Sequence, residues 1–374
     1  MRLMVNGLSV TNTSGAQVLL GHLQQMTEVL GRRVQLIMLV RAVQRQTFAA
    51  VSEQAEWCEA PDYTEHWLGR AVWERWHLPK VVVREGPEIY FSPSGYALAH
   101  LRLPQVIFCQ NPWAFVRAAR RRRDAPKAWL QRRAYAGTMD IADTMVFNSR
   151  YMQDAYREHA GQTERRGVIA YQAPDPATLE RTKVLPLSER VPGQLLCVSV
   201  MGPHKNVEAI LRAVQQLRTD PAMKALRLHV VGSWPDRAYE DKILGLIKEN
   251  ELGDCVELHG FVDREELERL YAESMAFILM SRCESFGIPA IEAQCFGTPV
   301  ISSDVCAIPE VCGDGGVYHP PDDVSAIARS IKEILTDQDQ WTELSTRAQQ
   351  NAAKYVWSSV SRPLVDLIES YIKD

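Results

Sequence analysis

Residues 284–297 read ESFGIPAIEAQCFG, and the fold of the chain is best inferred outward from this stretch. Pro289 stands near the start of an apolar run and a glycine stands just beyond its end, so we expect a helix over 289–296. Glu284 precedes this helix in a glycine-containing loop, and Glu292 lies within it. Free amides at a helix N-terminus attract anions, and carboxylates accept hydrogen bonds from hydroxyls. The stretch therefore predicts a site for a phosphate between hydroxyl-rich groups, as in a sugar nucleotide.

The next residues extend this pattern. A turn and a short apolar strand, GTPVISS, occupy 297–303, and IPEV and GDGG follow at 308–311 and 313–316. This segment resembles the C-terminal half of a family 4 glycosyltransferase with its Glu-x7-Glu motif. The resemblance is strong from about 195 to 316 and looser over most of the remaining chain. Without it, two glutamates at this spacing are better explained as solvated charge on a helix.

The resemblance implies roles for individual residues of this stretch. Glu284 would contact the transferred sugar, and Glu292 would contact the ribose of the nucleotide. Backbone groups of the intervening loop would lie near the diphosphate and the sugar, and they belong to Ser285, Phe286, Gly287 and Ile288.

Lys205 follows the first expected strand of the second half, in MGPHKN at 201–206. Ligands of open α/β sheets bind at the carboxyl ends of the strands, where an ammonium neutralises a leaving diphosphate. A solvated surface lysine is the alternative, but the resemblance implies a diphosphate-binding lysine here. The family often carries an arginine about five residues earlier, where this chain has Val200; Arg282 is the candidate to compensate.

Three further strand or helix ends are predicted to bind the donor. The resemblance implies that Gly232, Phe261 and Val262 line the pocket for the base, although ordinary turns explain the glycine equally well. Gly15 follows the first strand in NTSG at 12–15, where small residues let amides approach a phosphate or an acceptor oxygen. The sequence has neither GxGxxG nor GxxxxGK[ST], which argues against dinucleotide dehydrogenases and P-loop enzymes.

Gln110 and Asn111 follow another expected strand of the first half. Many members of the resembling family place a histidine in this loop, near the transferred sugar. Amides can hydrogen-bond to a sugar hydroxyl, but they cannot act as a general base near neutral pH. We therefore expect a sugar or acceptor contact here, with the acceptor proton passing to another group or to the leaving phosphate.

A block of basic residues interleaved with aromatic residues runs from Arg117 to Arg133. One interpretation is a solvated helix face. The other is contact with an anionic membrane surface or a lipid diphosphate, because many enzymes of the resembling family extend lipid-linked glycans.

Bulk properties limit the remaining classes. The chain has 374 residues with 46% hydrophobic content, which is enough for two domains, and its net charge of −4 gives no support for nucleic-acid binding. The eight cysteines include no Cys-x-x-Cys pair, so we expect free thiols in a reducing compartment. A signal peptide and a membrane-spanning run are not apparent, which predicts a cytoplasmic protein, peripheral at most at the inner membrane face.

Apolar strand-length runs alternate with helical patterns, which predicts an α/β fold with two mostly parallel sheets. Strands are expected at 2–5, 34–40, 89–92, 106–109 and 144–148, and again, after a proline-rich break at 171–193, at 195–200, 227–231, 256–259 and 276–280. The resembling family has this arrangement, called GT-B, in which two Rossmann-like domains face a central cleft. The domains are placed at 1–175 for the acceptor and 190–356 for the sugar nucleotide, with a helix at 357–374 that crosses back to the first domain.

These observations predict a retaining glycosyltransferase. It would move a hexose from a nucleoside-diphosphate sugar to a hydroxyl of a glycan or lipid-linked glycan, with Lys205 and Glu284 as the catalytic residues. No Asp-x-Asp motif follows a strand, so we expect no catalytic metal and no cofactor besides the donor substrate. Two alternatives stay open: another GT-B enzyme, such as a nucleotide-sugar epimerase or a phosphorylase, and a non-catalytic sugar-nucleotide-binding subunit.

Overall fold

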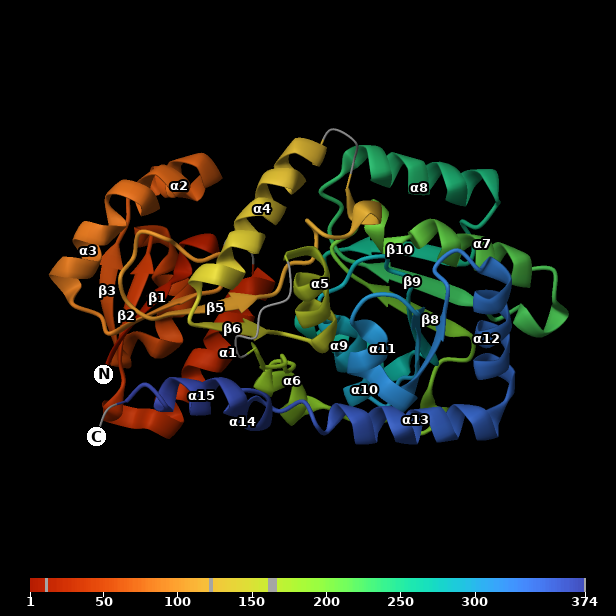
Figure 1. Ribbon diagram of the computed structural model, residues 1–374. Coiled ribbons are helices and arrows are strands. Elements are labelled where there is room, and N and C mark those ends of the chain that lie inside the picture. Colours follow the sequence, from red (N-terminus) through yellow and green to blue (C-terminus); the bar gives the residue numbers. More distant parts are fainter. Residues whose placement is uncertain (11–12, 121–123, 161–166, 373–374) are drawn as a thin grey trace. The chain divides into compact units, whose positions relative to one another are not determined.

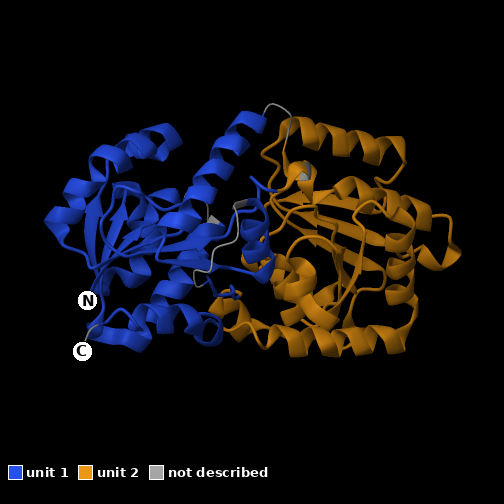
Figure 2. Ribbon diagram, in the orientation of Figure 1, with its two compact units in different colours: residues 1–115, 122–173, 357–374 blue, residues 116–121, 174–356 orange. Residues whose placement is uncertain are grey.

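The computed structural model describes residues 1–10, 13–120, 124–160 and 167–372 (Figure 1). These residues form two compact units (Figure 2). Unit 1 contains Met1–Phe115, Arg122–Ala173 and Trp357–Asp374, and unit 2 contains Val116–Arg121 and Pro174–Val356. Each unit is built on one parallel β-sheet.

The sheet of unit 1 has the strand order β3-β2-β1-β4-β5-β6-β7, and all its pairings are parallel. The central strands β1, β4, β5 and β6 are mostly apolar and almost entirely buried, because helices cover both faces of a parallel sheet. The bounds are β1 (Arg2–Asn6), β2 (Gln35–Val40), β3 (Ala55–Glu59), β4 (Ile89–Ser92), β5 (Gln105–Cys109), β6 (Thr144–Phe147) and β7 (Gly167–Ile169).

The helices of unit 1 connect these strands. They are α1 (Thr13–Leu30), α2 (Trp67–Trp76), α3 (Leu78–Glu85), α4 (Ala125–Ile141) and α5 (Arg150–Ala160), together with α14 (Trp357–Val360) and α15 (Arg362–Glu369) from the end of the chain.

The C-terminal segment packs against α1. Leu364, Val365 and Ile368 of α15 belong to the same buried apolar cluster as the core of the first sheet. On α1, a Cβ at Gly21 would stand 2.4 Å from the ring of Trp357, so only glycine allows this approach. Burial beside that ring lowers the pKa of His22 to about 3, and its Nδ1 forms a 2.9 Å hydrogen bond with the Ser361 hydroxyl. The return of the chain to unit 1 is thus fixed by dense packing.

The sheet of unit 2 has the order β10-β9-β8-β11-β12-β13 and is also entirely parallel. Its strands are β8 (Gln194–Val198), β9 (Arg227–Val231), β10 (Val256–Gly260), β11 (Ala276–Leu279), β12 (Val300–Ser303) and β13 (Gly316–His319). Its helices are α6 (Pro176–Arg181), α7 (Val207–Leu217), α8 (Arg237–Glu249), α9 (Arg264–Glu273), α10 (Ile288–Cys295), α11 (Ile308–Cys312), α12 (Val324–Thr336) and α13 (Gln338–Ala352).

The expected α/β class with two parallel sheets is confirmed, and the differences from the expected elements have local causes. The sequence did not predict β3 and β7, because β3 is an edge strand with mostly exposed or half-buried residues and β7 has only three. The supposed break at 171–193 contains α6, whose start is capped by Asp175 accepting from the Ala177 amide at 2.8 Å. A six-residue helix is too short to show periodicity.

Candidate functional site

The candidate site of unit 2 lies where the strand order of its sheet reverses. From β8 the chain moves outward to β9 and β10, and from β11 it moves the other way to β12 and β13. The loops after β8 and β11 therefore diverge at the carboxyl edge of the sheet, which is where open α/β sheets bind ligands. Lys205 follows β8 and Glu284 follows β11.

Lys205 and Glu284 form a direct ion pair between Nζ and Oε1. Their side chains are only 11% and 15% exposed, so this pair is far better shielded from solvent than an ordinary surface pair. The two loops are held together by backbone contacts as well, since the His204 carbonyl accepts from the Arg282 amide at 2.7 Å and from the Ser281 hydroxyl at 3.2 Å. The structure thus brings together the two residues that the sequence predicted as catalytic.

The N-terminus of α10 follows this pair directly. Gly287 precedes the helix with φ +97°, and a Cβ there would stand 3.1 Å from Ile308, so both conformation and space favour glycine. The side chain of this N-cap position cannot cap the helix. Pro289 has no amide hydrogen and the Ala290 amide donates to the Gly287 carbonyl at 2.9 Å, so Ile288 is the residue of this first turn whose amide remains for a ligand at the carboxyl edge of the sheet. Phe286 is buried and packs edge-on against Tyr355 with the ring centres 5.7 Å apart, so its side chain belongs to the core of the unit.

Glu292 lies one turn inside α10 and is half-buried. Its Oε2 accepts a 3.0 Å hydrogen bond from the hydroxyl of Tyr271 on α9. Burial raises the pKa of Glu292 from 4.5 to about 7, although the hydrogen bond from Tyr271 acts in the opposite direction. The sequence predicted Glu292 but missed Tyr271, which reads as an ordinary core residue of an amphipathic helix.

The ends of β8, β9 and β10 meet at tight backbone contacts. Gly232 has φ +134°, and a Cβ on it would stand 1.7 Å from the Ser199 carbonyl, so no other residue fits. Its amide donates to the Gly260 carbonyl at 2.7 Å. Phe261 follows with 90% of its side chain exposed, and Val262 is half-buried. An aromatic ring this exposed is available to stack on a flat ligand.

Arg282 does not simply replace the arginine that the resembling family often carries at the position of Val200. Val200 is 61% exposed. The Arg282 guanidinium forms an ion pair with Asp322, whose side chain is 73% exposed. Arg282 would have to leave this partner to contact a phosphate, so its compensating role stays a prediction.

The other predicted contacts lie in unit 1. Gly15 falls in the first turn of α1 rather than in a loop, and Asn12 of the same motif lies outside the described residues. Gln110 is half-buried and Asn111 is exposed after β5. The Asn111 side chain accepts a 3.0 Å bond from the Trp113 amide, which uses one of its acceptor sites to shape the loop.

The predicted basic block is divided in the structure. Arg117 belongs to unit 2 and α4 belongs to unit 1, while residues 121–123 lie outside the described part of the chain. Arg132 was counted as a surface charge, but its guanidinium donates to the carbonyls of Ala114 at 2.6 Å and Phe115 at 2.9 Å. Phe115 itself is core. The exposed residues of α4 include two large apolar side chains, Trp129 at 59% and Leu130 at 53%, with the Arg133 guanidinium 5.7 Å from the Trp129 ring centre.

Unit 1 carries a buried acid that the sequence did not reveal. Glu74 of α2 is 1% exposed and accepts from the Asn6 amide at 2.8 Å and the Tyr96 hydroxyl at 2.9 Å. Burial raises the pKa of Glu74 above its ordinary value. Asn6 ends β1 and also contacts the Tyr90 hydroxyl on β4 at 2.6 Å, so this network marks the strand reversal of the first sheet.

Helix length and polarity also bear on the expected relation to a membrane. Over the described ranges, no helix combines the length and the apolar character that crossing a bilayer requires.

The eight cysteines are free, and all but Cys306 are buried, as expected.

Comparisons with known proteins agree with this geometry. Residues 187–355 match the family model for glycosyl transferases group 1. Over 176 residues the chain is 33% identical to O-antigen chain mannosyltransferase B of Escherichia coli, and over 167 residues it is 30% identical to the O-antigen chain mannosyltransferase RfbU of Salmonella typhimurium. The matches cover 46% and 45% of this chain, and 45% and 44% of those relatives. The chain thus spans less than half the length of these curated relatives.

The fold extends further than the sequence similarity. Sucrose-phosphate synthase from Thermosynechococcus elongatus superposes with a TM-score of 0.78 at 18% identity, covering 99% of this chain and 98% of that one. The GT-B fold class is therefore confirmed. The match of residues 187–355 to the group 1 glycosyl transferases supports, over that region, the resemblance to family 4 glycosyltransferases.

Proposed function

We propose that the whole protein is a retaining glycosyltransferase that moves a hexose from a nucleoside-diphosphate sugar to a hydroxyl of a glycan or lipid-linked glycan. The observation that carries this proposal is the shielded Lys205–Glu284 pair at the strand reversal of unit 2, directly before the start of α10. A cation, a carboxylate and helix N-terminal amides at one sheet edge match the charges and hydroxyls of such a donor.

Donor binding would rearrange the ion pair. Lys205 exchanges the Glu284 carboxylate for a diphosphate oxygen, and the Ile288 amide at the start of α10 binds the same group. Glu284 is then free to accept hydrogen bonds from hydroxyls of the hexose. The positive charge of Lys205 stabilises the diphosphate most strongly as it leaves, because negative charge accumulates there in the transition state.

Glu292 is placed to bind the ribose, since it lies further along α10 than the diphosphate amides. The Tyr271 hydroxyl holds its carboxylate in position. Ribose hydroxyls that donate to Glu292 favour its ionised form, so donor binding would release a proton in the pH range where Glu292 is partly protonated.

Retention would follow from attack on the same face of the sugar that the diphosphate leaves. The acceptor oxygen bonds to the anomeric carbon as the bond to the phosphate oxygen breaks, and the acceptor proton passes to that phosphate oxygen. Gln110 and Asn111 are uncharged amides that orient hydroxyls and take no proton. This scheme needs no metal and no enzyme-bound intermediate.

The relatives favour mannose as the transferred sugar. Both O-antigen relatives described above are called mannosyltransferases, so GDP-mannose is the first donor to try, before UDP-sugars and dTDP-rhamnose. An O-antigen-like surface glycan is the corresponding acceptor class.

The decisive experiment combines a donor screen with one variant. Melting temperature is measured with GDP, UDP, dTDP and ADP, because a ligand that binds only the native state raises it. The matching sugar nucleotide is then supplied with glycan acceptors, and the linkage and anomeric configuration of the product are determined. Glu284→Gln should retain nucleotide binding and lose most transfer. Binding without turnover on any acceptor would favour a non-catalytic subunit, and a free epimerised sugar nucleotide would favour an epimerase.

Membrane contact at the cytoplasmic face is the second part of the proposal. Trp129 and Leu130 on α4 are exposed beside basic side chains. On α2, Leu68, Val72 and Trp76 recur every fourth residue and are 52%, 56% and 64% exposed, with the Arg75 guanidinium 5.0 Å from the Trp76 ring centre. Apolar residues flanked by cations are typical of helices that lie in an anionic lipid surface.

Vesicle sedimentation tests this contact. The protein should bind vesicles that contain phosphatidylglycerol and bind poorly to pure phosphatidylcholine. Val72→Ser with Trp76→Ser, and separately Trp129→Ser with Leu130→Ser, should weaken binding. Leu244→Ser is the matched control, because Leu244 is 48% exposed on α8 of unit 2. Unchanged vesicle binding in both double variants would mean that the exposed faces of α2 and α4 contact solvent and not the membrane.

A further inference from the structure

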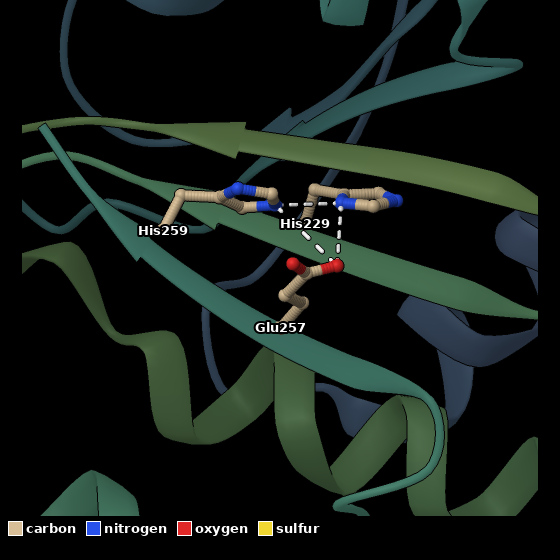
Figure 3. A group of neighbouring side chains, drawn as sticks. All are labelled: His229, Glu257 and His259. Atoms are coloured by element: carbon tan, nitrogen blue, oxygen red, sulfur yellow. Dashed lines mark hydrogen bonds and ion pairs between the residues drawn. The ribbon is translucent and has the colours of Figure 1, made fainter. Parts of the chain in front are cut away.

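Three potential metal ligands lie together on the strands β9 and β10 of the unit 2 sheet (Figure 3). His229 is on β9, and Glu257 and His259 are on β10. The register pairs Glu257 directly with His229. His259 lies where the register of β10 against β9 shifts, between Leu258 and Gly260, and its ring lies beside His229 and Glu257. Parallel pairing thus brings His229 together with His259, which lies 30 residues further along the chain.

The distances are close to those of a bound ion. His229 Nδ1 lies 2.7 Å from His259 Nε2, and Glu257 Oε2 lies 3.6 Å from the former and 3.7 Å from the latter. Bonds from zinc to these ligands are about 2.0–2.2 Å, so ligand atoms around a tetrahedral ion stand roughly 3.3 Å apart. The carboxylate is already near that spacing, and the two imidazoles need to separate by about half an ångström.

The surroundings suit a cation. The imidazoles are 17% and 16% exposed, whereas Glu257 is 65% exposed, which leaves the site open to solvent on the carboxylate side. Burial, and then His259, lower the pKa of His229, which favours the neutral ring that binds metals. Arg269 of the neighbouring α9 is neutralised by Glu266 and Glu273 at 2.7 and 2.6 Å, so its charge opposes an ion only weakly.

The geometry points to a binding site for a divalent transition-metal ion, Zn²⁺ in the first place, formed by His229, Glu257 and His259 with a water in the fourth position. Two imidazoles and one carboxylate favour Zn²⁺, Ni²⁺ or Cu²⁺ over Mg²⁺ and Ca²⁺, which prefer oxygen ligands. On binding, both facing nitrogens present lone pairs, and the proton shared between the rings moves to an outer ring nitrogen.

Such an ion would clamp the edge strand β10 to β9. His259 stands two residues before Phe261, and His229 stands three residues before Gly232, so the clamp lies at the base of both loops predicted to hold the nucleotide base. Lys205 and Glu284 follow other strands, and the ion takes no part in the transfer step. Its role is to order the sheet edge.

Metal binding to the chelator-treated full chain tests this site. We expect one equivalent of Zn²⁺ to bind and to raise the melting temperature, whereas Mg²⁺ and Ca²⁺ at the same concentration do neither. Co²⁺ should give the visible absorption bands of a four-coordinate site without a thiolate charge-transfer band, which separates this site from the cysteines. No Zn²⁺-dependent shift in melting temperature would overturn the proposal.

Variants locate the ion. Glu257→Gln replaces a largely exposed side chain, so the protein should fold normally and bind Zn²⁺ at least about tenfold more weakly. His229→Gln and His259→Gln should abolish binding. His319→Gln is the matched control, because His319 is another partly buried strand histidine of unit 2, and it should bind as the wild type does. Wild-type Zn²⁺ affinity in Glu257→Gln and His259→Gln would place the ion elsewhere and refute the assignment.

Discussion

The two units have sheets of the same type, but the charged residues at the strand reversal are partly exposed in unit 2 and buried in unit 1. Between β8 and β11, unit 2 presents Lys205 and Glu284 to each other with part of both side chains exposed. Between β1 and β4, unit 1 buries Glu74 in a network with Asn6 and Tyr96. The first arrangement can exchange one partner for a ligand. The second has both carboxylate oxygens occupied by protein donors, so it stabilises the fold. In both units the strand order sets the position at which the sheet reverses. The side chains at that position determine whether it suits a ligand or stabilises the fold.

The largest expected effect is on the rate of transfer, and it distinguishes the Lys205–Glu284 pair from an ordinary surface ion pair. Lys205→Ala should lower kcat/KM for transfer by roughly 10²–10³-fold, because it removes a cation that stabilises the leaving diphosphate. The matched control is Lys242→Ala, since Lys242 pairs with Glu208 at 2.6 Å in the same unit but is 57% exposed. Steady-state kinetics should show the control within about twofold of wild type. Equal losses in both variants, or none in either, would remove the distinction between the two pairs.

The next effect concerns stability in unit 1. Glu74→Ala should lower the free energy of unfolding by about 2–4 kcal/mol, because the Tyr96 hydroxyl loses its carboxylate acceptor and the buried Asn6 side-chain amide keeps its contact with Tyr90 but loses the one with Glu74. Chemical denaturation measures the change. Glu158→Ala on α5 is the control, with a side chain 79% exposed and an expected change within about 0.5 kcal/mol. An unchanged free energy of unfolding in Glu74→Ala would mean that the network of Glu74, Asn6 and Tyr96 does not stabilise unit 1.

A smaller effect is expected from the titration of Glu292. The pKa of this acid is about 7 in the folded protein against 4.5 for the free side chain, so the folded state binds its proton more tightly. The associated stability is fully present below about pH 4.5 and is lost as the pH rises through about 7. Glu292→Gln does not titrate.

The melting temperature of Glu292→Gln relative to wild type should therefore rise between pH 5 and pH 8, by about 1–3 °C. Differential scanning calorimetry at several pH values measures it. A constant difference across this range would show that Glu292 titrates as an ordinary exposed acid. In that case donor binding at Glu292 should release no proton near pH 7.

The smallest effect is expected from removal of metal ions. Transfer should survive treatment with a chelator within about twofold, because Lys205 and the amides of α10 supply the charge that a metal would otherwise provide. Initial rates before and after chelation measure this. A loss that Mg²⁺ or Mn²⁺ restores would contradict a metal-free transfer step. It would not bear on the proposed Zn²⁺ site, which is tested by binding.

The local sequence pattern was enough to predict a helix or strand wherever that element is amphipathic or uniformly buried. The strands β4 and β9 have the predicted bounds, and the helix between Glu284 and Gly297 lies where its proline and glycine indicated. The edge strand β3 was missed, because partial exposure removes the apolar run. The basic block was misjudged at Arg132, since no sequence pattern shows that a guanidinium donates to backbone carbonyls.

The sequence by itself determined the α/β class and the two sheets, because these depend on periodicity and turn residues within short segments. It also singled out Lys205, Glu284 and Glu292 through the resemblance to a family, and their roles stay predictions. Only the tertiary structure decided that Lys205 contacts Glu284, that Tyr271 holds Glu292, and that His229 meets Glu257 and His259. Each of these contacts joins residues from different strands or helices. The physical reason is that strand order and register set them, and neither is encoded within a single segment of the chain.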